Sequence, residues 1–156
     1  MESLRIGIAT AAIATVVIYA LGSGFWVSND SGWYRSLTQP SWQPPDWVFG
    51  VIWPYNFIML GIVGFVIARD ASISRAVTWL IFLVLSVCAA LAWSYLFYVP
   101  HQLPGAAIAL STTAALTIPI LIITFQTNQI YGWLLLPYQL WVITAASLSI
   151  GYASAN

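Results

Sequence analysis

The chain has 156 residues, of which 61% are hydrophobic and only 5% are charged. This composition lies outside the range of soluble globular proteins, and the length fits a single domain, residues 1–156. Four basic and four acidic residues leave a formal net charge of zero, so the chain offers no basic surface for nucleic acid. We therefore expect an integral membrane protein that does not bind nucleic acid.

Five apolar runs are long enough to cross a membrane as helices, which requires about 20 residues each. The sequence predicts spans at about residues 4–26, 47–68, 76–99, 105–125 and 130–152. Backbone groups in lipid must bond internally, and the runs are too long for barrel strands, so the expected fold is an all-α bundle of five transmembrane helices. The first run, flanked by Arg5, also has the length of a signal peptide, but we expect it to be a retained span.

The longest polar connection, residues 27–45, precedes the second span and is rich in tryptophan and proline. Proline fixes its own φ and restrains the preceding residue, so Pro40, Pro44 and Pro45 predict a stiff, extended lid. Asp46 is expected to be the N-cap of a helix that starts at Trp47. The lid is thus expected to lead directly into the second span.

The arginines indicate an orientation in the membrane. Arg5, Arg69 and Arg75 fall on one side of the expected bundle, and Arg35 falls on the other. Because cytoplasmic loops carry an excess of basic residues, we expect the N-terminus to face the cytoplasm.

Ionisable residues offer little material for catalysis. All eight acidic and basic residues, and His101, fall at the ends of expected spans or in loops. A carboxylate pair, a catalytic triad or a metal cluster therefore has no visible residues, and we assign no metal site and no required cofactor. His101 is either an interfacial loop residue, which we favour, or a haem or metal ligand. Cys88 is expected to be a small buried residue.

Small and amide side chains inside the spans are expected to mediate helix packing. Gly61 and Gly64 let helices approach closely, either within one bundle or between two protomers. Asn56 and Gln139 lie well inside their spans, and we expect each to hydrogen-bond to a neighbouring helix.

The tryptophans fall into two groups by position. Those near span ends are expected to form an interfacial belt, namely Trp26, Trp33, Trp47, Trp79 and Trp133. Deeper in the spans lie three aromatic stripes at helical spacing, namely Trp53 with Phe57, Trp93 with Phe97, and Tyr138 with Trp141 and Ala145. Two interpretations stay open: the stripes are the packed bundle core, or they line a flat, mostly apolar small-molecule site.

The lid and the start of the second span contain the pattern WY-x-x-L-x-x-PSW-x-PP-x-WVFG-x-x-W, from Trp33 to Trp53. This string closely resembles the signature of the TspO/MBR family of tryptophan-rich sensory proteins. The resemblance continues in the third and fifth spans, at Trp93-Ser94, Phe97, Pro137-Tyr138, Trp141 and Ala145. It covers essentially the whole chain and agrees with the count of five spans.

The resemblance implies a five-helix membrane protein, usually a homodimer. Its cavity beneath the first loop would bind porphyrins, haem-type tetrapyrroles or another planar hydrophobic small molecule. Membrane lipid would surround the protein. Carried over by motif position, the ligand-binding residues are Trp33, Tyr34, Pro44, Pro45, Trp53, Phe57, Trp93, Phe97, Tyr138, Trp141 and Ala145.

Two positions depart from the family pattern. Ala90 stands where the family often has an asparagine, which removes a polar contact from the expected pocket. Ser149 stands where the family often has another asparagine, and no basic residue follows Tyr152 in this sequence. We therefore expect a different ligand preference and no sterol recognition by the motif of animal members.

Three functions are compatible with these residues. The favoured one is a sensor or regulator in which a tetrapyrrole stacks among Trp53, Trp93 and Trp141. The second is an enzyme that degrades porphyrin oxidatively or in light, with Trp53 and Trp141 as the reactive groups and no other catalytic residue assigned. The third is transport of a tetrapyrrole or lipid precursor, for which the chain shows neither a charged pathway nor repeats.

Overall fold

The computed structural model describes residues 1–27 and 31–156, and Asp30 lies outside this part. The helices of the described chain are α1 (Glu2–Val27), α2 (Ser31–Ser36), α3 (Asp46–Asp70), α4 (Ile73–Tyr98), α5 (Leu103–Thr127) and α6 (Gln129–Ala155). Within the described residues, all of these except α2 are long and apolar enough to cross a membrane. The expected all-α bundle of five transmembrane helices is confirmed.

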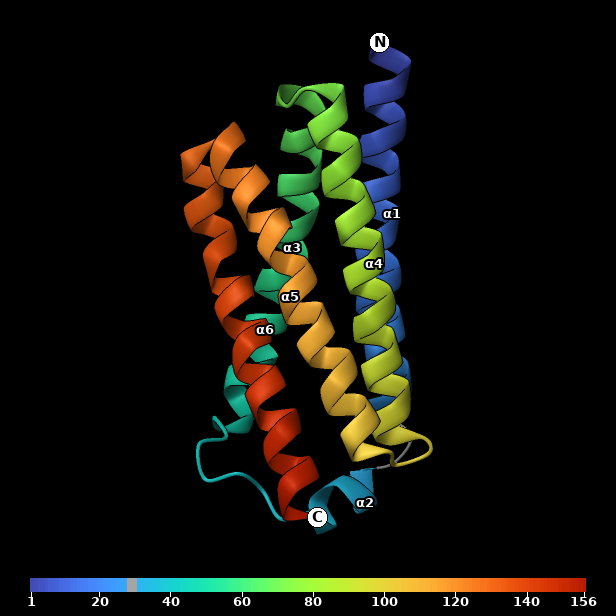
Figure 1. The fold of residues 1–156 in the computed structure, drawn as a ribbon, viewed down its shortest axis with the longest axis vertical. Coiled ribbons are helices and arrows are strands. Elements are labelled where there is room, and N and C mark those ends of the chain that lie inside the picture. The colour runs from blue at the N-terminus through green and yellow to red at the C-terminus, as the bar shows by residue number, and fades with distance from the viewer. Residues whose placement is uncertain (28–30) are drawn as a thin grey trace.

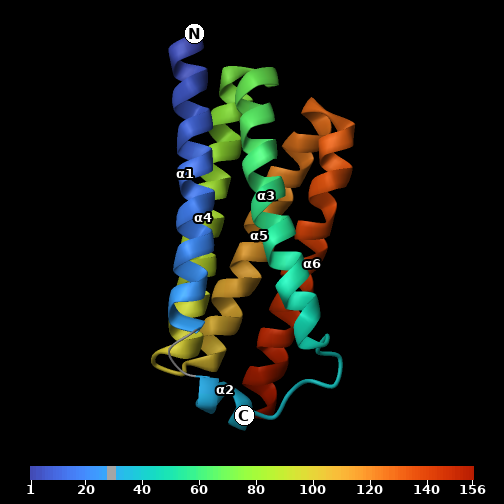
Figure 2. The same ribbon diagram turned by 180° about the vertical axis from the view of Figure 1, so that it is seen from behind.

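The five long helices run alternately up and down, so the connections gather at the two ends of the bundle (Figure 1, Figure 2). One end, here called the N-terminal end, holds the N-terminus, the α3–α4 turn and the α5–α6 turn. The other end, here called the lid end, holds α2, the segment from α2 to α3, the α4–α5 turn and the C-terminus. Helix α5 packs along α4 and α6, and α1 packs along α3 and α4.

The described arginines are distributed unequally between these ends. Arg5 in α1, Arg69 in α3 and Arg75 in α4 lie at the N-terminal end, and Arg35 in α2 lies at the lid end. This is the distribution from which a cytoplasmic N-terminus is expected, and the orientation in the membrane stays a prediction.

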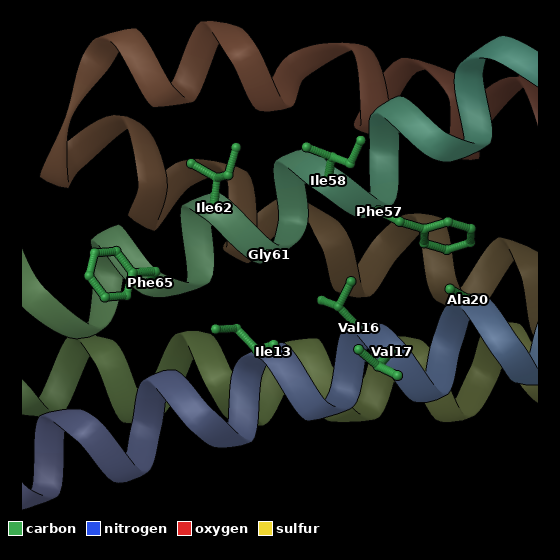
Figure 3. A pocket seen from close by; sticks show the side chains of 9 residues that line it. All are labelled: Ile13, Val16, Val17, Ala20, Phe57, Ile58, Gly61, Ile62 and Phe65. Carbon is green, nitrogen blue, oxygen red and sulfur yellow. The ribbon is translucent and has the colours of Figure 1, made fainter.

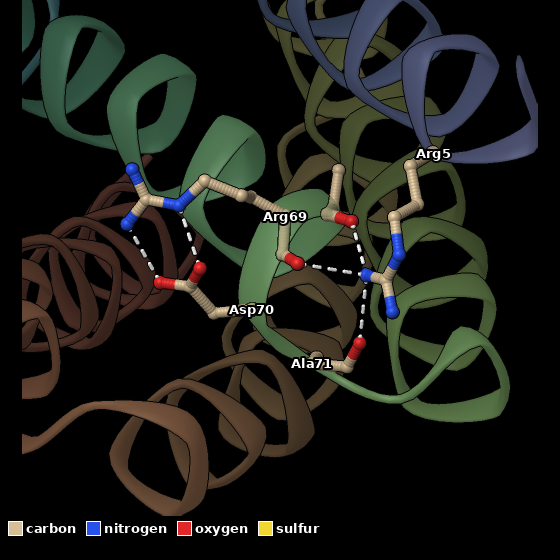
Figure 4. Close-up of polar contacts among 5 residues, drawn as sticks. Arg5, Arg69, Asp70 and Ala71 are labelled. Atoms are coloured by element: carbon tan, nitrogen blue, oxygen red, sulfur yellow. Dashed lines mark hydrogen bonds and ion pairs between the residues drawn. The ribbon is translucent and has the colours of Figure 1, made fainter. Parts of the chain in front are cut away.

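Arg5 ties α1 to the last turn of α3 (Figure 4). Its Nη1 donates hydrogen bonds to the carbonyl oxygens of Ala68 at 2.7 Å, Arg69 at 2.9 Å and Ala71 at 2.9 Å. The last carbonyls of a helix have no partner within the helix, and a cation is favourable at that end of the helix dipole. Arg5 therefore caps α3. The Arg69–Asp70 ion pair beside it is exposed and contributes little to stability.

The starts of α3 and α4 differ from the expected ones. Helix α3 begins at Asp46 itself, and the capping position is Pro45, which makes no side-chain cap hydrogen bond. The prediction of an Asp46 N-cap is therefore wrong: the carboxylate lies in the first turn, where it faces the positive end of the helix dipole. Helix α4 begins earlier than expected because the Ser72 hydroxyl accepts a hydrogen bond from the Arg75 N–H at 3.4 Å.

The connection from α1 to α3 is only partly extended. A short helix, α2, occupies Ser31–Ser36. After it the chain turns sharply, because the Gln43 N–H donates to the Pro40 carbonyl at 3.1 Å. The expected stiff lid is therefore the segment 37–45, which crosses the lid end between α2 and α3 (Figure 2).

Trp79 does not belong to an interfacial belt. It is fully buried, and its Nε1–H donates to the Thr124 hydroxyl at 3.1 Å, which joins α4 to α5. Gly64 lies against the indole, and a Cβ there would be 3.4 Å from it. Trp47 and Trp133, by contrast, are 70% and 65% exposed on the outside of the bundle. Depth along a helix predicts how near a residue lies to the membrane surface but not which face it occupies.

Cys88 is also placed differently from the expectation. It lies in the middle of α4 but is exposed, so its side chain faces outward from the bundle. Ser86 and Ala90, two residues away on either side and therefore on the opposite face of the helix, are buried. An apolar run in a membrane helix has lipid on one face, so apolar surroundings in sequence do not imply burial within the protein.

Candidate functional site

Aromatic side chains gather at two levels of the bundle. The first group, here called the inner cluster, joins α1, α3 and α6 and consists of Tyr19, Phe49, Trp53, Phe57 and Trp141. The second group, here called the lid cluster, lies toward the lid end and consists of Trp33, Tyr34, Trp93, Phe97, Tyr98, His101 and Tyr152. The α3 and α6 stripes expected from the sequence therefore meet at Trp53 and Trp141, whereas the α4 stripe of Trp93 and Phe97 lies in the lid cluster.

In the inner cluster the rings are in direct contact. Trp53 stacks on Phe57 at a centroid distance of 5.5 Å and meets Trp141 edge-on at 6.3 Å. Tyr19 from α1 closes the group, with centroids 6.1 Å from Trp53 and 5.1 Å from Phe57. Aromatic rings at such distances attract each other beyond the effect of burial. A planar ligand at this level would replace part of these ring contacts with its own.

Several polar groups lie among these apolar side chains. The Tyr138 hydroxyl donates to the Tyr19 hydroxyl at 3.4 Å, which joins α6 to α1. Gln139 makes the expected interhelical bond, since its Nε2 donates to the Ala114 carbonyl of α5 at 3.0 Å. The corresponding expectation for Asn56 is wrong: among the described residues neither amide atom has a partner, and the same holds for Trp141 Nε1.

Trp93 of the lid cluster also packs against the main buried core of the bundle. It contacts Phe97 and Tyr98 of the lid cluster, with centroids 5.9 Å and 6.3 Å away. Its Nε1–H donates to the Ser149 hydroxyl of α6 at 3.2 Å. Ser149, one of the two departures from the family pattern, thus fixes the orientation of the indole. Ala90, the other departure, is buried in the core.

Three side chains hold the lid onto the end of α6. Gln43 Nε2 donates to the Tyr34 hydroxyl at 3.1 Å, and the Tyr152 hydroxyl bonds to the same oxygen at 3.1 Å. The Tyr152 hydroxyl also donates to Gln43 Oε1, so the three groups form a closed ring of hydrogen bonds. Because Tyr34 belongs to α2 and Gln43 to the lid, this ring joins both α2 and the lid to α6.

Further contacts fix the remainder of the lid. The Thr38 N–H donates to Asn156 Oδ1 at 2.8 Å, and Asn156 Nδ2 donates back to the Thr38 carbonyl at 3.2 Å. Trp42 Nε1 donates to the Ser147 hydroxyl at 3.2 Å. The lid passes so close to Gly151 that a Cβ there would lie 2.7 Å from Pro40 and 2.9 Å from Trp42.

The TspO/MBR family model matches residues 9–154 of this chain. The chain belongs to the TspO/MBR family. It is 28% identical to the tryptophan-rich protein TspO of Bacillus cereus, over 92% of this chain and 97% of that protein. It is 24% identical to the human translocator protein, over 83% of this chain and 78% of that protein, and 30% identical to the uncharacterized membrane protein YtaB of Bacillus subtilis, over 90% and 92%. The resemblance is confirmed, and with the five spanning helices it makes this chain an integral, multi-pass membrane protein.

The residues carried over from the TspO/MBR motifs divide between the two clusters. Trp53, Phe57 and Trp141 lie in the inner cluster, and Tyr138 and Ala145 belong to the same buried core. Trp33, Tyr34, Trp93 and Phe97 lie in the lid cluster. Pro44 is half-buried, and Pro45 is exposed at the start of α3. Ligand binding by these residues stays a prediction.

His101 takes part in the lid cluster. Its ring stacks on Trp33 at a centroid distance of 3.7 Å with an interplanar angle of 7°. The residue has a positive φ of 57° in the short connection between α4 and α5. These features fit a structural loop residue that supports α2. Within the described residues, no group of three or more His, Cys, Asp or Glu is placed to hold a metal ion.

Sequence reasoning missed Tyr19 in this TspO/MBR chain. The side chain is 1% exposed, contacts two rings of the inner cluster and bonds to Tyr138. A signal was present, since Tyr19 continues the buried stripe Ile8, Ala12 and Val16 at helical spacing along α1. Gln43 and Tyr152 were missed for another reason: Tyr152 bonds to Tyr34 and Gln43, which are 118 and 109 residues away in the sequence.

A groove of about 530 Å³ lies between α1 and α3 on the outside of the bundle (Figure 3). It is lined by apolar side chains of both helices, among them Val16, Phe57 and Ile62. Phe57 belongs to this groove and also to the inner cluster. Its ring therefore separates the aromatic interior from the surface that faces the membrane.

Proposed function

We propose that this TspO/MBR protein binds a porphyrin or a related tetrapyrrole between the inner cluster and the lid cluster, and acts as a membrane sensor or regulator of such a molecule. The observation that carries the proposal is the state of Trp141. Its indole is 7% exposed and lies among the rings of Phe49 and Trp53, and its N–H has no partner among the described residues. A buried indole usually finds a hydrogen-bond acceptor, which a bound ligand would supply.

Affinity would come from apolar burial and ring contact. A tetrapyrrole presents two large flat faces, and ring pairs contribute about 0.5–1.5 kcal/mol each beyond burial. Insertion removes the edge contact between Trp53 and Trp141 but supplies a face to each indole. Trp93, held by Ser149, offers a third indole on the lid side. This arrangement is the usual one for a small-molecule site between helices, mostly apolar with a few oriented polar groups.

The lid would retain the ligand. Its hydrogen-bond ring of Tyr34, Gln43 and Tyr152 joins the lid to α6, the helix that also carries Trp141. A molecule that separates α3 from α6 would therefore also change the position of the lid. Such a link between an interior site and a surface segment is what a sensor requires.

The test is a titration of the purified protein with protoporphyrin IX in the dark, followed by porphyrin absorbance. We expect Trp53→Ala and Trp141→Ala to weaken binding at least about 10-fold, the loss of roughly 1.4 kcal/mol. Trp133→Ala is the matched control, because Trp133 lies on the same helix as Trp141 but is exposed on the outside. Equal affinity of the wild type and both interior variants would remove the proposed site.

A further inference from the structure

We infer that Asn56 is a specificity-determining residue of the proposed tetrapyrrole site, and that its amide pairs with a neutral ligand group carrying a hydrogen-bond donor and an acceptor side by side. A carboxylic acid in its neutral form and a lactam both have this chemistry. The inference rests on the proposed function and extends it, because Asn56 is not among the residues that the family motif carries over.

Asn56 lies in the wall of the aromatic site. It is three residues after Trp53 on α3, so the two side chains lie on the same side of the helix, and it directly precedes Phe57. Trp53 in turn meets Trp141 across the interface of α3 with α6. The Asn56 side chain is 0% exposed, and among the described residues neither Oδ1 nor Nδ2 has a partner.

This amide is costly for the unliganded bundle. A buried polar side chain that gives up its bonds to water without replacing them destabilises the fold, and Asn56 leaves a donor and an acceptor unpaired together. Gln139 of α6, which is also buried, at least donates to the Ala114 carbonyl. A leucine of similar size at position 56 would avoid the cost. A ligand that hydrogen-bonds to the Asn56 amide within the site would remove this cost.

The neighbouring groups favour a neutral partner. The charged residues that the structure describes lie at helix ends or in the connections between helices, so none can neutralise an anion beside Asn56. The polar groups of the surrounding core, among them the Trp141 N–H, the Gln139 amide and the Tyr19 and Tyr138 hydroxyls, are uncharged. In such surroundings a carboxyl group stays protonated, because burying its ionised form is much more costly.

A neutral acid or a lactam matches the amide geometrically. The Asn side chain presents N–H and C=O at one edge, and both ligand groups present the complementary pair, so two parallel hydrogen bonds form. Because the site excludes water, each such bond discriminates strongly against ligands that leave the amide unpaired. Asn56 therefore selects which tetrapyrroles bind, whereas the aromatic rings supply affinity for all of them.

Three probes distinguish the two ligand groups that could pair with Asn56, a neutral carboxylic acid and a lactam. Protoporphyrin IX carries carboxylic acids, its dimethyl ester carries no such donor, and biliverdin dimethyl ester carries lactams alone. The full-length wild type and Asn56→Leu are titrated with each probe in the dark. We expect Asn56→Leu to weaken binding of the acid, the lactam or both at least about 10-fold, and of protoporphyrin dimethyl ester less than about 2-fold. Which probe is affected identifies the source.

Two controls keep the result interpretable. The midpoint of thermal unfolding without ligand should not fall in Asn56→Leu, since an unpaired amide is replaced by an apolar side chain of similar size. Asn56→Ser, which keeps a donor and an acceptor, should bind the affected probe more tightly than Asn56→Leu, and it serves alone if the leucine variant does not fold. Equal weakening for all three probes, or none, overturns the inference while the proposed function stands. No binding of any probe by the wild type overturns both.

Discussion

The Trp93 indole N–H donates a hydrogen bond to the Ser149 hydroxyl at 3.2 Å, and this bond joins α4 to α6. Ser149 is 2% exposed, so water does not compete for its hydroxyl. The residue stands where the family often has an asparagine, whose longer side chain would reach farther toward the indole.

The first prediction concerns the loss of stability when this bond is removed. Ser149→Ala leaves the Trp93 N–H without its acceptor, so we expect a loss of about 1–2 kcal/mol in unfolding free energy. Ser149→Asn should restore an acceptor and recover most of the loss. Denaturation of the protein in detergent, followed by tryptophan fluorescence, measures both. Ser154→Ala, an exposed position on the same helix, is the control, and an equal effect there would contradict the role assigned to the bond.

The fold could be predicted from the sequence because the signals are local. Apolar runs of spanning length define the helices, and the Trp33 to Trp53 motif identifies the family. The lid could be placed for the same reason, since Pro40, Pro44 and Pro45 restrict the backbone wherever they occur. Helix starts were less secure, because an aspartate is favourable both at the capping position and in the first turn, and the sequence does not show which of the two Asp46 occupies.

The faces of the helices could not be predicted as well. In a membrane helix the outer face is as apolar as the inner one, so hydrophobic periodicity does not separate Trp79, which is buried, from Cys88, which is exposed. The bond between Tyr19 and Tyr138 and the unpaired state of Asn56 were hidden for a further reason, since both depend on contacts between helices. The candidate site residues were therefore found through the motif. The structure was needed to show that they divide between the inner cluster and the lid cluster.

The second prediction concerns the passage of the lid over α6. Gly151→Val places a side chain where a Cβ alone would lie 2.7 Å from Pro40 and 2.9 Å from Trp42, so the lid must move outward. We expect amide hydrogen exchange in residues 37–45 to increase at least about 10-fold, while exchange in α5 stays unchanged. Gly50→Val is the control, since a Cβ there meets no atom within 4 Å. Unchanged exchange in the lid would mean that it accommodates the larger side chain in place.

The third prediction compares two glycines on α3. A Cβ at Gly64 would lie 2.9 Å from Ala12 on α1 and 3.4 Å from Trp79 on α4, so Gly64→Ala should destabilise the bundle by about 1–3 kcal/mol. Gly61 faces the outer groove, where a Cβ meets no atom within 4 Å. Gly61→Ala should stabilise the helix by about 0.5–1 kcal/mol, because alanine has the higher helix propensity. Thermal unfolding measures both, and equal shifts would refute the packing role of Gly64.

The last prediction concerns Arg5. Its three hydrogen bonds to the carbonyls of Ala68, Arg69 and Ala71 cap the C-terminus of α3 and hold α1 against that helix. Hydrogen bonds from a charged donor contribute about 1.5–3 kcal/mol, so Arg5→Ala should lower the unfolding free energy by at least that amount. Arg5→Lys keeps the charge at the helix end but has no planar guanidinium, and should recover only part of the loss.

Arg75 is the matched control for Arg5, because it is exposed in the first turn of α4 at the same end of the bundle. A positive charge is unfavourable near a helix N-terminus, so Arg75→Ala should leave stability unchanged or raise it slightly. Hydrogen exchange in the last turn of α3 adds a local readout, which should increase in Arg5→Ala but not in Arg75→Ala. If both variants lose the same stability, the arginines act through net charge at this end, and the capping bonds of Arg5 are not what stabilises α3.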